Sequence, residues 1–265
     1  MDSHTVNGAL NFAADRTNGG KWSNTDRSRT TQLLKSEQVI FEDARYLTSA
    51  PSLEREGFQS VHLPMQAPDW TDAEWVAQTY LPKSMELVRE LTGARHVVPF
   101  FRNGVLIRDT GSTAHAPAAE FVHIDQTGES ARPFLEAAVD EKILQSYSRI
   151  KIFNIWRPIT PPPQDVPLAI CDQRTLDRND LVTGYTVEPN FPDGVAYLTS
   201  VFNPEQKWYY ISDLTQDDAV LFKGYDSDTT EPVSCLHGAF RQPVPPPGAV
   251  PRASVEFRVF AFFDA

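Results

Sequence analysis

The residues His123 and Asp125, in the run FVHIDQT, are the first candidates for chemistry. On an extended segment, side chains two positions apart project from the same side of the backbone. An imidazole and a carboxylate arranged in this way can hold a metal ion. The alternative is a surface strand end, where the aspartate caps a turn and the histidine is solvated.

A third ligand would favour the metal site, and the β-rich second half of the chain offers one histidine, His237, in SCLHGAF. Considered alone, it can equally be a core histidine with a satisfied hydrogen bond. Two histidines and one carboxylate leave three adjacent positions open on an octahedral Fe(II) ion, an arrangement that suits oxygen chemistry. We therefore predict His123, Asp125 and His237 as the ligands and catalytic centre.

Fifteen positions after His237 the strand-like run PRASVEFRVFAFF places Arg252 and Ser254 on one face. A guanidinium and a hydroxyl spaced in this way can clamp a carboxylate, here the distal carboxylate of 2-oxoglutarate. The alternative is an arginine of an edge strand in a surface ion pair. Arg258 on the same face and Arg241 nearer the histidine stay open as alternatives.

Five further residues are candidates for contact with substrate. Asn154 and Trp156 share one face of IKIFNIW, whereas Arg157 projects from the other face unless the strand bends. Arg157 could bind a substrate carboxylate or form a structural ion pair. Lys223 and Tyr225 in LFKGY are expected to share a face at the rim of the pocket.

The elements that must position these residues are mainly strands. From residue 150 onward, short runs rich in β-forming residues alternate with Pro, Asn, Asp and Gly, which favours an antiparallel sandwich or a small barrel. The runs are IKIFNIW, VAYLTSVF, KWYYIS, AVLFKGY and ASVEFRVFAFF.

The first half of the chain predicts helices. Thr71 and Glu74 have the spacing of a capping box, and Gly93 is a suitable end for the helix that follows. A second helix is expected to begin at Pro133, since proline is favoured at the first helical position. Between them, Asn103-Gly104 has the composition of a two-residue hairpin turn.

The 265 residues are 41% hydrophobic, enough for one large domain with extensions. Residues 13–35 are polar and rich in Ser and Thr, which is typical of a mobile arm or of a lid over the substrate. We predict an N-terminal arm or lid over 1–36 and one domain with helical support over 37–265.

The charge and the cysteines restrict location and partners. A formal charge of −11 repels nucleic acid and anionic membranes, so a small molecule is the expected partner, with association into a homodimer left open. Only two cysteines, Cys171 and Cys235, are present, and they lack the CxxC spacing. Reduced thiols and the absence of an apolar leader favour a cytoplasmic location.

As a set, the segments HID, NIWRPI, WYYISDLT, LFKGYDS, LHGAF and PRASVEFR resemble a fungal and bacterial family. It includes the aspergillic-acid-type hydroxylase/desaturases, gibberellin desaturase-like proteins and a cephamycin methoxylation component. The likeness covers about residues 95–265. It implies a mainly β, double-stranded β-helix (jelly roll, cupin-like barrel) with flanking helices. It also implies His123, Asp125 and His237 as iron ligands, with Arg252 and Ser254 on 2-oxoglutarate.

The activity implied by this resemblance is that of a non-heme Fe(II)- and 2-oxoglutarate-dependent dioxygenase of specialised metabolism. Such an enzyme uses O₂ to hydroxylate, desaturate or cyclise a small molecule at an unactivated C–H bond, releasing succinate and CO₂. The alternatives are a non-redox metalloenzyme, such as an isomerase or hydrolase, on the same barrel, and a jelly roll that binds a small molecule without catalysis.

Overall fold

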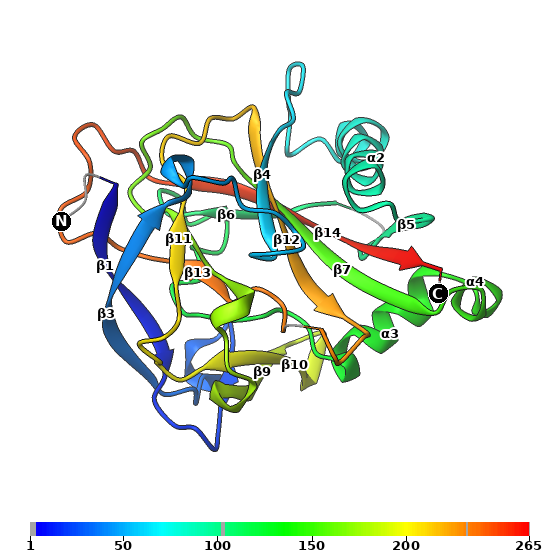
Figure 1. Cartoon of the computed structure of the whole chain (residues 1–265), viewed down its shortest axis with the longest axis horizontal. Helices are drawn as coiled ribbons and strands as arrows, with labels where there is room; N and C mark the ends of the chain where they lie inside the picture. Colours follow the sequence, from blue (N-terminus) through cyan, green and yellow to red (C-terminus); the bar gives the residue numbers. More distant parts are fainter. Residues whose placement is uncertain (1–3, 102–103, 232, 265) are drawn as a thin grey trace.

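A computed structural model describes residues 4–101, 104–231 and 233–264. The fold is mainly β with helices at its periphery, as predicted (Figure 1). An antiparallel six-stranded sheet follows the order β4-β12-β7-β14-β5, with β6 also paired to β14. Its strands are β4 (Phe58–His62), β5 (His96–Pro99), β6 (Leu106–Asp109), β7 (Arg149–Pro158), β12 (Asp218–Asp226) and β14 (Ala253–Phe263).

Two smaller sheets lie opposite the six-stranded sheet. The order β1-β3-β11-β8-β13 comprises β1 (Thr5–Ala13), β3 (Leu34–Asp43), β8 (Leu168–Cys171), β11 (Trp208–Tyr210) and β13 (His237–Ala239). The order β10-β9-β2 comprises β2 (Lys21–Trp22), β9 (Leu181–Glu188) and β10 (Phe191–Ser200). Segment 121–125 joins them, since His123 bridges to His237 and Ile124 to Leu198.

The barrel core lies between the facing sheets, because the alternation of each strand sends every second side chain inward. Trp156 and Phe222 from the six-stranded sheet pack there against Ile170 and Tyr209 from the five-stranded sheet. On the outer face of the six-stranded sheet, Phe153, Ile155, Leu221, Phe257 and Val259 pack with Val88 and Leu81 of the helical layer.

That helical layer comprises α1 (Ala73–Trp75), a π-helical turn (Val76–Tyr80) and α2 (Leu81–Thr92). The helix ends at Gly93 in the left-handed conformation, as predicted. The expected capping box is wrong by one residue. Asp72 is the N-cap and accepts from the backbone N–H groups of Glu74 and Trp75, because its short carboxylate reaches both.

Two further expectations about local structure are wrong. The second helix, α3 (Gly128–Ala138), begins at a capping box of Thr127 and Ser130 and contains Pro133 instead of starting there. It is followed by α4 (Glu141–Gln145). No hairpin joins the described residues of β5 and β6, which pair with the same edge of β14; Asn103 lies outside the described residues.

The predicted arm over 1–36 contains elements of the sheets. Strand β1 pairs along its length with β3, and its Leu10 and Phe12 are fully buried, so residues 5–13 are part of the structural framework. The boundary predicted at residue 36 falls inside β3. The remaining short helices are 3₁₀ turns: η1 (Arg27–Arg29), η2 (Ala44–Tyr46), η4 (Gln173–Thr175) and η5 (Arg178–Asp180).

Candidate metal site

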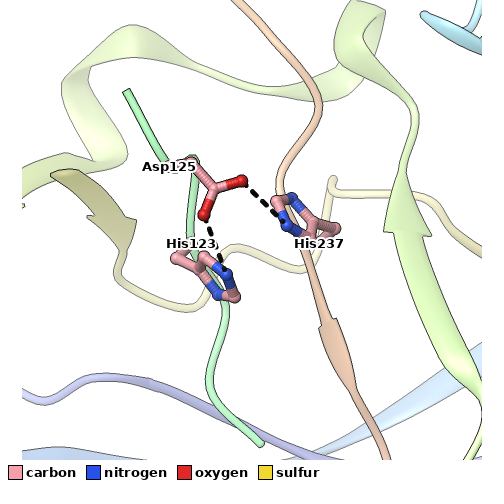
Figure 2. Close-up of side chains that lie close together, drawn as sticks. All are labelled: His123, Asp125 and His237. Carbon is pink, nitrogen blue, oxygen red and sulfur yellow. Dashed lines mark ion pairs between the residues drawn. The ribbon is translucent and has the colours of Figure 1, made fainter. Parts of the chain in front are cut away.

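The two predicted histidine ligands lie directly opposite each other on neighbouring chain segments. The backbone N–H of His123 donates to the carbonyl of His237 at 2.9 Å, and the reverse bond is 3.0 Å long. Residues paired in this way project to the same face, so both imidazoles point into the space between the sheets. Asp125, two residues along, joins them (Figure 2).

The three ligand atoms form a compact group. His123 Nε2 lies 3.7 Å from Asp125 Oδ1, and His237 Nε2 lies 3.5 Å from Asp125 Oδ2. One ligand atom from each residue lies within 4.8 Å of the others. Atoms that share one first-row metal ion at ~2.1 Å lie about 3 Å apart, so a small movement closes the group around an ion.

The hydrogen bonds of both histidines direct Nε2 toward that position. His123 Nδ1 donates to the carbonyl of Phe121 at 2.9 Å, and His237 Nδ1 donates to the carbonyl of Cys235 at 3.3 Å. A carbonyl oxygen only accepts, so Nδ1 carries the hydrogen and Nε2 keeps its lone pair. This is the orientation that metal-binding histidines use.

Asp125 is held by two partners. Asn154 Nδ2 donates to its Oδ2, and Arg258 Nη2 donates to its Oδ1, each at 2.7 Å. Burial by itself would raise the pKa of Asp125, but Arg258 and the two imidazoles outweigh burial, and the pKa lies below its usual range. Asp125 is therefore a carboxylate at neutral pH.

Burial is also the largest influence on His123. Together with the neighbouring His237 it lowers the pKa of His123 to about 3, against a smaller opposing effect of Asp125. The neutral form, which is the form that binds metal, is thus the form present at neutral pH.

The predicted clamp lies at the start of β14: Arg252 directly precedes the strand, and Ser254 lies on its inner face. Arg252 is almost fully buried, Nη1 donates to the carbonyl of Val166 at 2.8 Å, and its guanidinium carbon lies 5.4 Å from the centre of the Trp156 ring. Within the described part of the chain, Arg252 Nε and Ser254 Oγ are buried without a hydrogen-bond partner. Burial and the neighbouring Arg108 lower the pKa of Arg252 to about 10.

The two alternative arginines are engaged elsewhere. Arg258 is ion-paired with Asp125 and Glu256. Arg241, with a side chain 56% exposed, is paired with Glu120 at 2.6 Å. Arg258 Nε is also buried without a partner, but its guanidinium is already paired with two carboxylates. Arg252 is buried and has no ion pair among the described residues, which favours Arg252 with Ser254 as the carboxylate clamp.

The substrate candidates on β7 separate as their alternation predicts. Asn154 and Trp156 face inward, whereas Arg157 lies on the outer face, fully buried beneath the helical layer. Arg157 Nη2 donates to the backbone carbonyls of Leu63 and Gln216. Its position is that of a structural arginine, and its prediction as a substrate residue is corrected accordingly.

Lys223 and Tyr225 do not share a face. A bulge shifts the register of β12 between them, so Lys223 lies opposite Phe153 and Tyr225 opposite Ile152. Tyr225 lines a cavity of about 370 Å³ together with Ile124 and Gln126. His123 and Asp125 alternate with these two residues along the chain, and the three predicted metal ligands are not among the residues that line the cavity.

Two residues of the inner face were not among the predicted site residues. Glu256 contacts Arg258, and Arg108 lies across from Ser254 on β6. The sequence could have indicated Glu256, because the alternation of side chains along a strand places it on the same face as Ser254 and Arg258. Nothing in the sequence indicated Arg108, because the expected hairpin paired β6 with β5 and not with β14.

Comparisons with known proteins agree in family. A family model described as "Oxidoreductase/YMDC permease-like domain" matches residues 9–262. The hydroxylase/desaturase efuI of Hormonema carpetanum is 29% identical, with 100% of this chain and 97% of the relative covered. The Fe(II)/2-oxoglutarate-dependent dioxygenase nvfI of Aspergillus novofumigatus (strain IBT 16806) is 32% identical, with 72% and 69% covered.

A solved structure is also similar. The iron and alpha-ketoglutarate-dependent endoperoxidase NvfI matches with a TM-score of 0.86 and 27% identity, covering 100% of both chains. This similarity confirms the predicted jelly roll. No helix within the described ranges is long and apolar enough to cross a membrane.

Proposed function

Because this chain belongs to the "Oxidoreductase/YMDC permease-like domain" family and is an Fe(II)/2-oxoglutarate-dependent oxygenase, we propose that His123, Asp125 and His237 bind its iron and that Arg252 and Ser254 bind its co-substrate. The observation that carries the proposal is the convergence of two Nε2 lone pairs and one carboxylate from distant segments. This donor set fits ferrous iron and leaves open positions for small ligands.

The bound iron and 2-oxoglutarate supply the oxidising power: O₂ is consumed, 2-oxoglutarate becomes succinate and CO₂, and a C–H bond of a small-molecule substrate is oxidised. The residues of the chain bind and orient. Asn154 and Arg258 fix the Asp125 carboxylate, and the two backbone carbonyls fix the imidazoles. Arg252 and Ser254 offer unused donors to the distal carboxylate.

Family membership favours the oxygenase over a non-redox metalloenzyme and over a binding protein without catalysis. The oxidation of the C–H bond leads to hydroxylation, desaturation or oxidative cyclisation of the substrate. Asn154 and Trp156, on the inner face beside the ligands, are the predicted substrate contacts that we retain.

The iron site is tested by an anaerobic titration with Fe(II) and 2-oxoglutarate. We expect a weak visible charge-transfer band in the unmodified protein and its loss in His237→Ala. His62→Ala, at an exposed histidine paired with Asp218, is the matched control and should keep the band. The absence of the band in folded, unmodified protein with both Fe(II) and 2-oxoglutarate present would refute the proposal.

The clamp is tested by Arg252→Gln. Because the guanidinium supplies charge-assisted donors, we expect the concentration of 2-oxoglutarate needed for half-saturation to rise by about 10- to 100-fold, with iron affinity nearly unchanged. Arg241→Gln is the control, since its arginine is paired with Glu120 at the surface. Equal dependence on 2-oxoglutarate in both variants would exclude Arg252 as the clamp.

We further propose that residues 14–33 cover the substrate. Support comes from the Trp22 ring, whose centre lies 4.6 Å from that of the Phe121 ring; the Phe121 ring centre lies 4.9 Å from that of His123.

A cytoplasmic location is supported by the two buried free cysteines. The charge of −11 opposes binding to nucleic acid or anionic membranes, and a homodimer stays a prediction that sedimentation can test.

A further inference from the structure

Arg108 lies on the inner face of the barrel beside the co-substrate clamp. Strand β6 pairs with β14 so that Arg108 stands opposite Ser254. Directly paired residues project to the same face of a sheet, so Arg108 belongs to the face that carries Arg252, Glu256 and Arg258. A third guanidinium therefore lies at this site.

Arg108 and Arg252 both lack a close counter-ion among the described residues, unlike Arg258. Arg258 is paired with Asp125 and Glu256, and Arg252 is the proposed partner of 2-oxoglutarate. Among the described residues, no carboxylate oxygen lies within ion-pair distance of Arg108. Its one side-chain hydrogen bond in that part of the chain reaches the carbonyl of Pro117 at 3.5 Å. Burial lowers the pKa of Arg108, which indicates a poorly solvated cation.

An aromatic cluster, comprising Phe100, Phe101, Phe134 and Phe191, lies at the other side of Arg258. The backbone N–H of Phe100 donates to the Arg258 carbonyl at 2.8 Å. The ring centres of Phe100 and Phe134 lie 4.7 Å apart, those of Phe101 and Phe134 5.7 Å, and those of Phe134 and Phe191 6.0 Å. Phe101 and Phe191 are 43% and 44% exposed, so the cluster reaches the surface.

The arrangement along β14 places the ligand group between these two features. Arg108 is opposite Ser254, and the Phe100 ring of the aromatic cluster stacks on Phe260 at 4.8 Å, six residues or about 20 Å further along the strand at ~3.3 Å per residue. Arg258 lies between these two positions and contacts Asp125. A molecule bound to both features at once would pass over the proposed iron site.

We propose that the substrate is an apolar carboxylic acid, whose carboxylate is bound by Arg108 and whose skeleton packs on the aromatic cluster. This inference rests on the proposed function, since Arg252 is taken as the partner of 2-oxoglutarate. Arginine binds carboxylates bidentately, and aromatic rings supply large apolar contact areas. Arg108 then orients the acid, and the aromatic cluster gives affinity for its skeleton.

The test compares acids with their methyl esters, which keep the skeleton and remove the charge. The probes are abietic acid with methyl abietate and myristic acid with methyl myristate. Binding is measured by equilibrium dialysis against protein loaded with Mn(II) and 2-oxoglutarate, so that Arg252 is occupied and no turnover is needed. We expect at least one acid to bind about 10- to 100-fold more tightly than its ester.

Variants assign the preference to a residue. Arg108→Gln should bind acid and ester equally, and Arg108→Lys should retain part of the preference. Arg132→Gln, which removes an exposed arginine of α3 paired with Glu136, should keep the full preference. Phe191→Ala should weaken acid and ester by the same factor, because it removes apolar contact only.

These binding results test the substrate proposal independently of the proposed iron site. The proposal would be overturned if neither acid bound more tightly than its ester. It would also be overturned if the preference for the acid survived in Arg108→Gln with an unchanged melting temperature. A raised requirement for 2-oxoglutarate in Arg108→Gln would also overturn it, since Arg108 would then serve the co-substrate. The charge-transfer band with Fe(II) and 2-oxoglutarate tests the proposed function independently of these acids.

Discussion

At the scale of single residues, the histidines were recognisable by type but their roles depended on groups that spacing does not reveal. The HxD pair and a distant histidine were predicted from sequence. Their orientation comes from backbone carbonyls two residues earlier in each case. Asn154, predicted as a substrate contact, also donates to Asp125, a bond that joins residues 29 positions apart. Sequence could not predict this bond, because it depends on how two segments meet.

The support of Asp125 gives a prediction. Asn154→Ala removes a donor to the carboxylate, and the loss of such a supporting hydrogen bond weakens metal binding by about 10- to 100-fold. The measurement is Mn(II) affinity by electron paramagnetic resonance. Asn203→Ala is a matched control, since Asn203 donates to Asp180 in the same way at a different place. Unchanged Mn(II) affinity in Asn154→Ala would contradict this role.

At the scale of elements, alternation predicted strands but not their partners. The five late runs form strands, and the helix ending at Gly93 was predicted, since both depend on local pattern. The hairpin between β5 and β6 was wrong because a turn composition does not exclude both strands pairing with β14. The prediction that Lys223 and Tyr225 share a face was wrong, because a bulge between them reverses the alternation of side chains.

The pairing of segment 121–125 with β13 gives a second prediction. A Cβ added at Gly238 would lie 2.8 Å from the Phe121 carbonyl oxygen, which accepts the His123 Nδ1 hydrogen. Because the atom in the way belongs to the backbone, it cannot move aside without disturbing the paired segment. Gly238→Ala should therefore lower the free energy of unfolding by about 1–3 kcal/mol and weaken metal binding. Chemical denaturation and Mn(II) titration measure both effects.

A matched substitution separates crowding from the general effect of adding a methyl group. At Gly128 the same Cβ would lie 3.1 Å from the hydroxyl oxygen of Tyr225, the end of a side chain that can turn away. Gly128→Ala at the start of α3 should therefore change stability by less than about 1 kcal/mol. Equal effects of the two substitutions would show that the contact with Phe121 is unimportant.

At the scale of the whole molecule, the site depends on a topology that composition and motifs specify only in part. Residues 121–125 lie between β13 and β10 and thereby join two sheets. Strand β14 brings Arg258, and Arg252 directly before the strand, to the opposite wall. The jelly roll itself was inferred by resemblance. Strand spacing alone left a sandwich and a barrel equally open, because it does not determine which strands become neighbours.

A metal ion that joins these walls should stabilise the entire fold. An ion that binds the folded chain alone adds about 2.7 kcal/mol at a concentration of 100 times its dissociation constant. For a chain of this size, each kcal/mol raises the melting temperature by roughly 2–4 °C, so Mn(II) should raise it by about 5–10 °C. Calorimetry measures the shift, and a chelator should reverse it. In His237→Ala the shift should fall below about 2 °C, whereas His62→Ala, whose imidazole is exposed, should retain it. An unchanged shift in His237→Ala would mean that the stabilising ion binds elsewhere.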